Sequence, residues 1–130
     1  VGIQVGTRFL VAEECTISQA YKDKVLKAKD IDSVVTGKRL GHPVRSIRNA
    51  FTREYQKAEY DASSVSDEEL EKMGAGVLRL AAREGDVKNG CVLAGQVASM
   101  VTKEQPAREI IVEMFTEAEE VLKGAAKWVK

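Results

Sequence analysis

Three glycine-centred segments of this chain combine residue types that could bind an anionic ligand through the backbone. They are Gly6-Thr7-Arg8, residues 41–45 (Gly-His-Pro-Val-Arg) and residues 85–96. Glycine lets the backbone approach a ligand closely, and N–H groups at a turn that opens a helix suit a phosphate. Because glycine also marks ordinary turns and helix boundaries, the residue types alone favour a structural role for each segment.

The first segment follows a short β-prone run. Val1, Ile3 and Val5 are β-branched and alternate with smaller or polar residues, which predicts a strand. A buried strand that runs directly into a glycine turn is typical of the middle or the end of a parallel sheet. Because this run starts at residue 1 without an initiator Met, we expect the chain to be the C-terminal piece of a larger protein.

The composition is that of one ordinary domain, with 44% hydrophobic and 31% charged residues. The 20 basic and 20 acidic residues balance, so there is no electrostatic reason to expect nucleic acid or an anionic membrane as a partner. No apolar run approaches the roughly 18 residues of a membrane span. Cys15 and Cys91 have no metal-like spacing, so we expect buried reduced thiols and no metal site. A cytoplasmic location is the default expectation for a chain of this composition.

Local signals in the first half predict the elements that would position the glycine segments. The first is a helix capped by Ser18 that ends near Lys29, and the second is a small hairpin formed by β-prone runs within 31–36 and 43–47. A helix capped by Asn49 then reaches about Glu59, and a short helix capped by Ser66 reaches Met73.

The second half predicts further helices. Gly76 opens a helix whose buried residues would be Val77, Leu78, Leu80 and Ala81, and Gly85 would end it in a left-handed conformation. A turn at 86–90 leads to a helical pattern at 97–101. From Pro106 to Val129 one face stays apolar, which predicts a long structural helix.

Several of these segments, in fixed order, resemble one enzyme superfamily. They are residues 1–10, 22–30, 34–37, 41–45, 48–49, 84–86 and 94–96. Together they resemble the superfamily of nitronate monooxygenases and flavin-dependent enoyl-ACP reductases. The Gly-His-Pro-Val-Arg sequence at 41–45 is more similar to the bacterial enoyl-ACP reductases, because nitronate monooxygenases more often have Arg at the position of His42.

The resemblance implies an α/β fold, with this chain as the C-terminal fragment of an FMN-binding TIM (β/α)8 barrel. The fragment would be mostly helical, with the last barrel strand and a small hairpin. Residues 1–29 would hold that strand, the phosphate-binding turn and a helix. Residues 30–102 would form a mostly helical cap and substrate segment, and residues 103–130 the C-terminal amphipathic helix.

The resemblance also implies two groups of site residues. Gly6 and Thr7 would contact the FMN phosphate, with Gln4 beside them. Arg8 would either neutralise the phosphate charge or form an outward salt bridge.

The second group is residues 93–96, which would approach the flavin ring and the acyl pocket. Leu93 stands where these reductases often have Met, and it keeps that pocket apolar. Ala94 and Gly95 complete the approach, and Gln96 would hydrogen-bond the cofactor or substrate or else cap the next helix.

The chain is expected to hold no catalytic residue of its own. His42 is its only histidine, and between Gly41 and Pro43 it is a turn residue. The catalytic histidine of the resembled family lies in a Gly-Gly-His segment that this sequence lacks. We therefore expect the chain alone to be inactive and to need the N-terminal remainder of the same protein.

The function implied by the resemblance is FMN-dependent enoyl-ACP reduction in fatty-acid elongation. A hydride would pass from NAD(P)H to FMN and then to the β-carbon of an acyl-carrier-protein-bound 2-enoyl thioester. Nitronate monooxygenase, with FMN and oxygen, is the alternative within the same fold. A non-catalytic helical interaction module is the alternative from another class, and a homodimer is a further candidate assembly.

Overall fold

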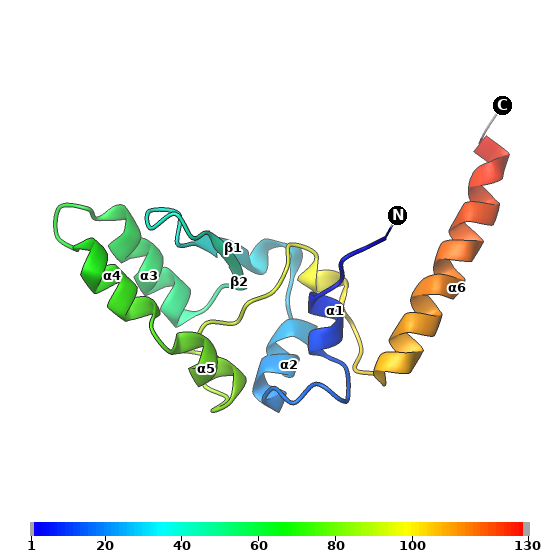
Figure 1. Ribbon diagram of the computed structural model, residues 1–130, viewed down its shortest axis with the longest axis horizontal. Helices are drawn as coiled ribbons and strands as arrows, with labels where there is room; N and C mark the ends of the chain where they lie inside the picture. The colour runs from blue at the N-terminus through cyan, green and yellow to red at the C-terminus, as the bar shows by residue number, and fades with distance from the viewer. Residues whose placement is uncertain (1, 129–130) are drawn as a thin grey trace.

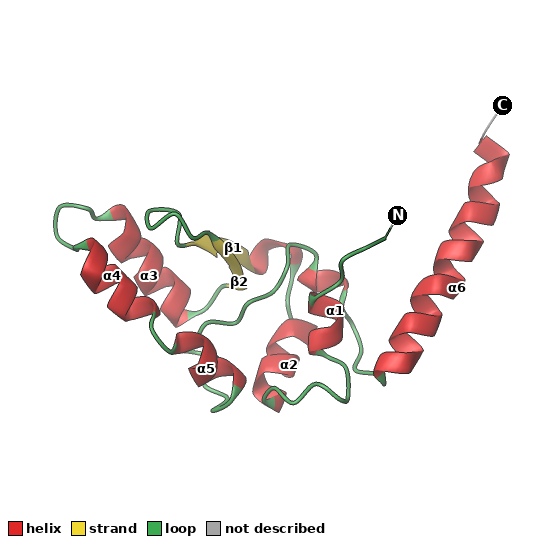
Figure 2. Cartoon of the chain, viewed as in Figure 1, coloured by secondary structure: helices red, strands yellow, loops and turns green. Residues whose placement is uncertain are grey.

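The computed structural model describes residues 2–128. Short helices surround a two-stranded hairpin, and one long helix extends from the body at the C-terminal end (Figures 1 and 2). Within the described residues, no helix has both the length and the apolar character needed to cross a bilayer.

The predicted hairpin is confirmed. After a single 3-10 turn (η1, Asp30–Asp32), β1 (Ser33–Thr36) pairs antiparallel with β2 (Val44–Ile47). In the connection, Gly37 has a φ of +78°, and a Cβ there would lie 2.4 Å from the carbonyl oxygen of His42. The turn therefore requires glycine at position 37.

A third segment extends the hairpin along β2. The Ile47 N–H donates to the Val92 carbonyl at 2.8 Å, and the Ala94 N–H donates to the Arg45 carbonyl at 3.2 Å. Leu93 lies opposite Ser46 in an antiparallel bridge. This pairing fixes the start of the predicted 93–96 segment against the hairpin.

The main core lies between this small sheet and α2 (Gln19–Leu26). Ser18 caps α2 as predicted, because its hydroxyl accepts the Tyr21 N–H, and it also donates to the Ala81 carbonyl at 2.8 Å. The helix ends at Leu26, earlier than the predicted Lys29. The buried cluster comprises Val11, Tyr21, Val25, Ile47, Ala81, Val92, Ala94, Ala98 and Val101.

Two helices begin at the caps that the sequence predicts. α3 (Ala50–Tyr60) starts after Asn49, and α4 (Asp67–Gly74) starts after Ser66. Each cap accepts a backbone N–H from the residue three positions later. Figure 1 shows α3 and α4 side by side at the end of the molecule opposite the long C-terminal helix.

The predicted buried face of the next helix is largely wrong. α5 (Val77–Ala82) forms where expected, and Gly85 has the predicted positive φ of +79°. Only Ala81 of this helix is buried, however, and Leu78 is 44% exposed. The helix is six residues long and packs through one edge, so most of its apolar side chains stay outside the core.

The long helix α6 (Ala107–Ala125) follows Pro106 as predicted and continues into a 3-10 turn (η3, Ala126–Trp128). It extends away from the body in Figure 1. Among its residues, Ile110 is buried, whereas Phe115 and Leu122 are each 72% exposed. The expected helix is therefore confirmed, but its apolar face is not covered within the described residues. Val129 lies outside them.

The strand predicted at residues 1–5 is not formed. Residues 2–6 have no regular secondary structure, Ile3 is 79% exposed, and Val1 lies outside the described residues. A parallel strand forms only when neighbouring strands satisfy its backbone, and none lies beside this segment in the described part of the chain. Ile3 and Val5 instead line a shallow apolar hollow with Ile111, Met114 and Phe115 of α6.

One short element is smaller than expected, and another was not predicted. The helical pattern at 97–101 is reduced to one 3-10 turn (η2, Ala98–Met100). A four-residue helix, α1 (Thr7–Leu10), follows directly after Gly6. The turn at Gly6-Thr7 therefore opens a helix, as an anion-binding turn would.

A buried lysine joins three segments of the fold. Lys22 is 4% exposed, and its Nζ donates to the Ala12 carbonyl and to Glu104 Oε1, both at 2.7 Å. Hydrogen bonds from Lys22, and then from Gln19, lower the pKa of Glu104 below its ordinary value of 4.5. The ion pair thus fastens the segment before α6 to α2.

This ion pair predicts an acid-sensitive part of the stability. A carboxyl whose pKa is lower in the folded state stabilises the fold fully above its unfolded pKa, and loses that effect as pH falls through the folded value. We expect Glu104→Gln to have a flatter stability profile than the wild type below pH 4.5. Urea unfolding midpoints measured across this range test it. Parallel profiles for the two proteins would contradict the expectation.

Candidate functional site

One cavity collects residues from both predicted groups. It has a volume of about 620 Å³ and is lined by Gly6 and Thr7 on one side and by Leu93, Ala94 and Gly95 on another. Its remaining wall comes from Leu10 of α1, Ile17 before α2, and residues of α2, α5 and the start of β2, and it is mostly apolar. The fold thus brings together two segments that lie far apart in the sequence.

A direct hydrogen bond joins these two segments. The Gly95 N–H donates to Thr7 Oγ1 at 2.8 Å, across 88 residues of sequence. A threonine hydroxyl has one proton to donate and two lone pairs, so Thr7 keeps its donor while it accepts from Gly95. Gly6 borders open space, because a Cβ there would meet nothing within 4 Å. This corner can therefore receive an anion.

The backbone of residues 93–95 is fixed from three directions. Ala94 pairs with β2, Gly95 with Thr7, and the Leu93 carbonyl accepts from the Tyr21 hydroxyl at 2.7 Å. Ala94 is buried and Leu93 is half-buried. Gln96 is exposed, and the cap proposed for it is not formed, because η2 has no side-chain cap.

Arg8 and Gln4 do not line this cavity. Arg8 donates to the Lys103 carbonyl at 3.0 Å and to Gln105 Oε1, and so connects α1 to the segment before α6. This is neither of the two interactions predicted for Arg8, because its observed partners are uncharged oxygens. Gln4 lies exposed in the irregular N-terminal segment.

Sequence reasoning does not place Tyr21 at the cavity. Tyr21 was assigned to a helix face, and it is buried as that assignment requires, but its ring also lines the cavity. A buried tyrosine hydroxyl needs a hydrogen-bond partner, which is the signal that could have drawn attention to it. Arg45, which donates to Ser33 Oγ at 2.9 Å, also borders the cavity.

The remaining candidate residues are structural. His42 lies exposed in the hairpin connection, where its N–H donates to the Gly37 carbonyl at 3.0 Å. Burial raises the pKa of the Cys91 thiol, so Cys91 stays a protonated core residue, whereas Cys15 is only partly buried. No cluster of metal-ligating side chains is present among residues 2–128.

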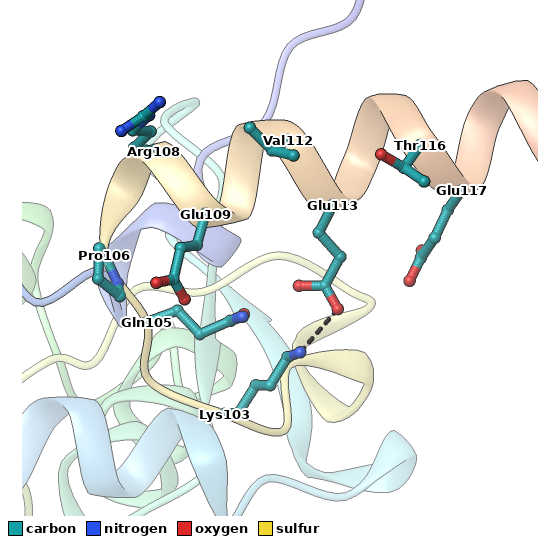
Figure 3. Close-up of a pocket in the computed structure, with 9 residues that line it drawn as sticks. All are labelled: Lys103, Gln105, Pro106, Arg108, Glu109, Val112, Glu113, Thr116 and Glu117. Atoms are coloured by element: carbon teal, nitrogen blue, oxygen red, sulfur yellow. Dashed lines mark hydrogen bonds and ion pairs between the residues drawn. The ribbon is translucent and has the colours of Figure 1, made fainter.

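A second hollow of about 700 Å³ lies along the N-terminal half of α6 (Figure 3). It is slightly larger than the first cavity, but none of the predicted site residues lines it. Its central feature is an ion pair between Lys103 Nζ and Glu113 Oε1 at 2.7 Å, and this hydrogen bond lowers the pKa of Glu113. The second hollow lies between α6 and the segment before it, whereas the first cavity is bordered by backbone from both predicted groups of site residues, the turn at Gly6-Thr7 and residues 93–95.

Comparison with known proteins places this geometry in a family. The family profile described as nitronate monooxygenase matches residues 1–117, so the chain belongs to the nitronate monooxygenase family. A probable nitronate monooxygenase of Staphylococcus saprophyticus is 31% identical over 93% of the chain. One from Staphylococcus aureus strain MSSA476 is 26% identical over the same share. The chain spans about a third (33%) of the length of these relatives.

Solved structures agree with this membership. The structure of FabK from Thermotoga maritima matches 95% of the chain and 39% of its own chain, with a TM-score of 0.88 and 35% identity. A nitroalkane oxidase from Streptomyces ansochromogenes matches 92% of the chain and 34% of its own chain, with a TM-score of 0.63 and 25% identity. The predicted fold class, a portion of a TIM-barrel protein, is thereby confirmed.

Proposed function

We propose that this chain is part of an FMN-dependent enoyl-ACP reductase. The observation that carries the proposal is the stronger likeness to FabK, an enoyl-ACP reductase, with a TM-score of 0.88 against 0.63 for the nitroalkane oxidase. The Gly-His-Pro-Val-Arg sequence at 41–45, which forms the connection and start of β2, supports the same branch.

The residues present fit the phosphate of FMN. Thr7 keeps a free hydroxyl donor, and the N–H groups of Thr7 and Arg8 precede the first hydrogen bond of α1, which Phe9 donates to the Gly6 carbonyl at 3.0 Å. Gly6 leaves room beside them. FMN, when bound, supplies the hydride chemistry, while Gly6 and Thr7 hold its phosphate and residues 93–95 form the adjacent wall. Gln4 would join this site only after a change in the irregular N-terminal segment, and Arg8 only after its side chain leaves the Lys103 carbonyl and Gln105.

The cavity wall suits an apolar acyl chain. Leu10, Ile17 and Leu93 present aliphatic side chains to it, and such a lining suits the alkyl part of an acyl substrate. Nitronate oxidation remains the second candidate, because the family profile and the curated relatives carry that name.

A paired assay on the complete protein separates the candidates. We expect anaerobic oxidation of NADH or NADPH that depends on crotonyl thioester, at least about tenfold faster than without it. Oxygen uptake with an alkyl nitronate, and no reaction with the thioester, would instead establish nitronate oxidation. Inactivity toward both, without bound yellow flavin, would favour a non-catalytic helical module. The 130-residue chain alone is expected to be inactive.

The proposed function implies binding partners and a cellular location. The remainder of the same protein would supply the other barrel strands and the proton donor, and an acyl carrier protein would deliver the substrate. We also propose that the complete protein is cytoplasmic and forms a homodimer.

A further inference from the structure

The carbonyl of Leu93 faces away from the sheet. Val92 and Ala94 pair with β2 through the Val92 carbonyl and the Ala94 N–H. Because successive backbone groups of an extended chain alternate in direction, the Leu93 carbonyl is left pointing to the other side. On that side, the Leu93 carbonyl accepts a hydrogen bond from the Tyr21 hydroxyl at 2.7 Å.

Tyr21 is itself rigidly held. Its side chain is 2% exposed, and it belongs to the main core cluster. The hydroxyl of Ser18 caps the start of α2 and donates to the Ala81 carbonyl of α5, which fixes the helix that carries Tyr21. Burial raises the pKa of the Tyr21 hydroxyl, so it stays protonated and able to donate.

A second hydroxyl holds the same segment two residues later. Thr7 Oγ1 accepts the Gly95 N–H at 2.8 Å, and a Cβ at Gly95 would lie 3.1 Å from this oxygen. Residues 93–95 are therefore clamped between α2 and α1, with β2 along their edge. A shift of this wall would break at least one of these bonds.

We propose that Tyr21 is a positioning residue of the active site, whose hydroxyl sets the place of Leu93 and of the cavity wall beside it. The inference rests on the proposed function, in which this wall faces the flavin and the acyl substrate. Tyr21 acts through Leu93, so its hydroxyl is expected to influence the rate of acyl reduction and the surroundings of the flavin, while the fold depends on its ring.

The test is Tyr21→Phe in the complete protein. The ring stays and only the hydroxyl is lost, so we expect folding and flavin content to be retained. We expect kcat with crotonyl thioester to fall about tenfold, because a small misplacement of a cavity wall is costly at the reacting atoms. The KM for the nicotinamide substrate should stay unchanged, and the visible circular dichroism of the bound flavin should change.

Tyr55→Phe is the matched control. Tyr55 is also buried, at 6% exposed, but it lies on α3, packs on Phe51 at a ring separation of 5.6 Å, and does not line the cavity. The Tyr55→Phe substitution should leave both kcat and the flavin spectrum unchanged.

Two outcomes would overturn the proposal. One is a Tyr21→Phe protein with wild-type kcat and flavin spectrum. The other is a loss of activity that follows a matching loss of folded protein or flavin, which would make the hydroxyl purely structural. If the wild type does not reduce the thioester, the proposed function fails, and the flavin spectrum of Tyr21→Phe still decides the positioning role.

Discussion

Asn49→Ala is expected to lower the free energy of unfolding by about 3 kcal/mol. Asn49 is 5% exposed, and its side chain makes three hydrogen bonds, of which two are buried and one is partly buried. Oδ1 accepts the Thr52 N–H at 2.9 Å, and Nδ2 donates to the Val87 carbonyl at 2.8 Å and to the Gly90 carbonyl at 2.7 Å. Alanine would leave a helix end uncapped and two carbonyls without this donor.

Two control variants separate the effect of the helix cap from the effect of the hydrogen bonds between Asn49 and the turn at 87–90. Ser66→Ala removes a solvent-exposed cap of the same kind from α4 and should cost only about 1 kcal/mol. Asn49→Asp keeps the acceptor for Thr52 but places a carboxylate oxygen against two carbonyls, so it should be at least as harmful as Asn49→Ala. Urea unfolding of the three variants measures the differences. Equal losses for Asn49→Ala and Ser66→Ala would show that only the cap matters.

Caps and turns of this kind are the part of the fold that could be predicted from the sequence. Ser18, Asn49 and Ser66 each act on a backbone N–H three residues away, so the relevant signal lies within four residues. The hairpin and the left-handed Gly85 were predictable for the same reason. Local chemistry decides these features, and distant residues change them little.

The wrong predictions concern features that depend on distant neighbours. A strand at residues 1–5 requires other strands, and a buried face on α5 requires a surface to cover it. Alternation and helical periodicity reveal which side chains would favour burial, but not whether a partner surface is present. The family assignment survives the missing strand because the matching motifs extend over residues 1–117.

The sequence could predict some of the residues that meet in the candidate site. Gly6, Thr7 and residues 93–95 were named from the family resemblance, and the fold brings them into one cavity. Their hydrogen bond could not be predicted, because it joins residues 88 positions apart. Tyr21 could not be predicted as part of the site, because an aromatic residue on a helix face gives no sequence signal of the cavity that it borders. Arg8 has uncharged partners from the segment before α6, which only the tertiary structure reveals.

Gly90→Ala is expected to be the most damaging glycine substitution outside the hairpin turn, with a loss of about 3 kcal/mol or more. A Cβ at Gly90 would lie 2.6 Å from the Ala81 backbone nitrogen, 2.6 Å from the Asp86 carbonyl oxygen and 2.8 Å from the Ala81 Cβ. These atoms belong to α5 and to the turn itself, so no flexible side chain can move aside. The clash should separate the turn from α5 and disturb the Gly90 carbonyl that Asn49 binds.

Gly74→Ala is the matched control for this substitution. Gly74 ends α4, and a Cβ there would meet only the Tyr55 ring at 3.7 Å, an ordinary contact. Alanine should therefore be neutral or slightly stabilising at position 74. Thermal and urea unfolding of both variants, with flavin content of the complete protein, measure the contrast. Because residues 91–95 continue directly from Gly90 into the cavity wall, the Gly90→Ala protein should also bind flavin less well. A Gly90→Ala protein as stable as Gly74→Ala would mean that α5 can move away from the turn without cost.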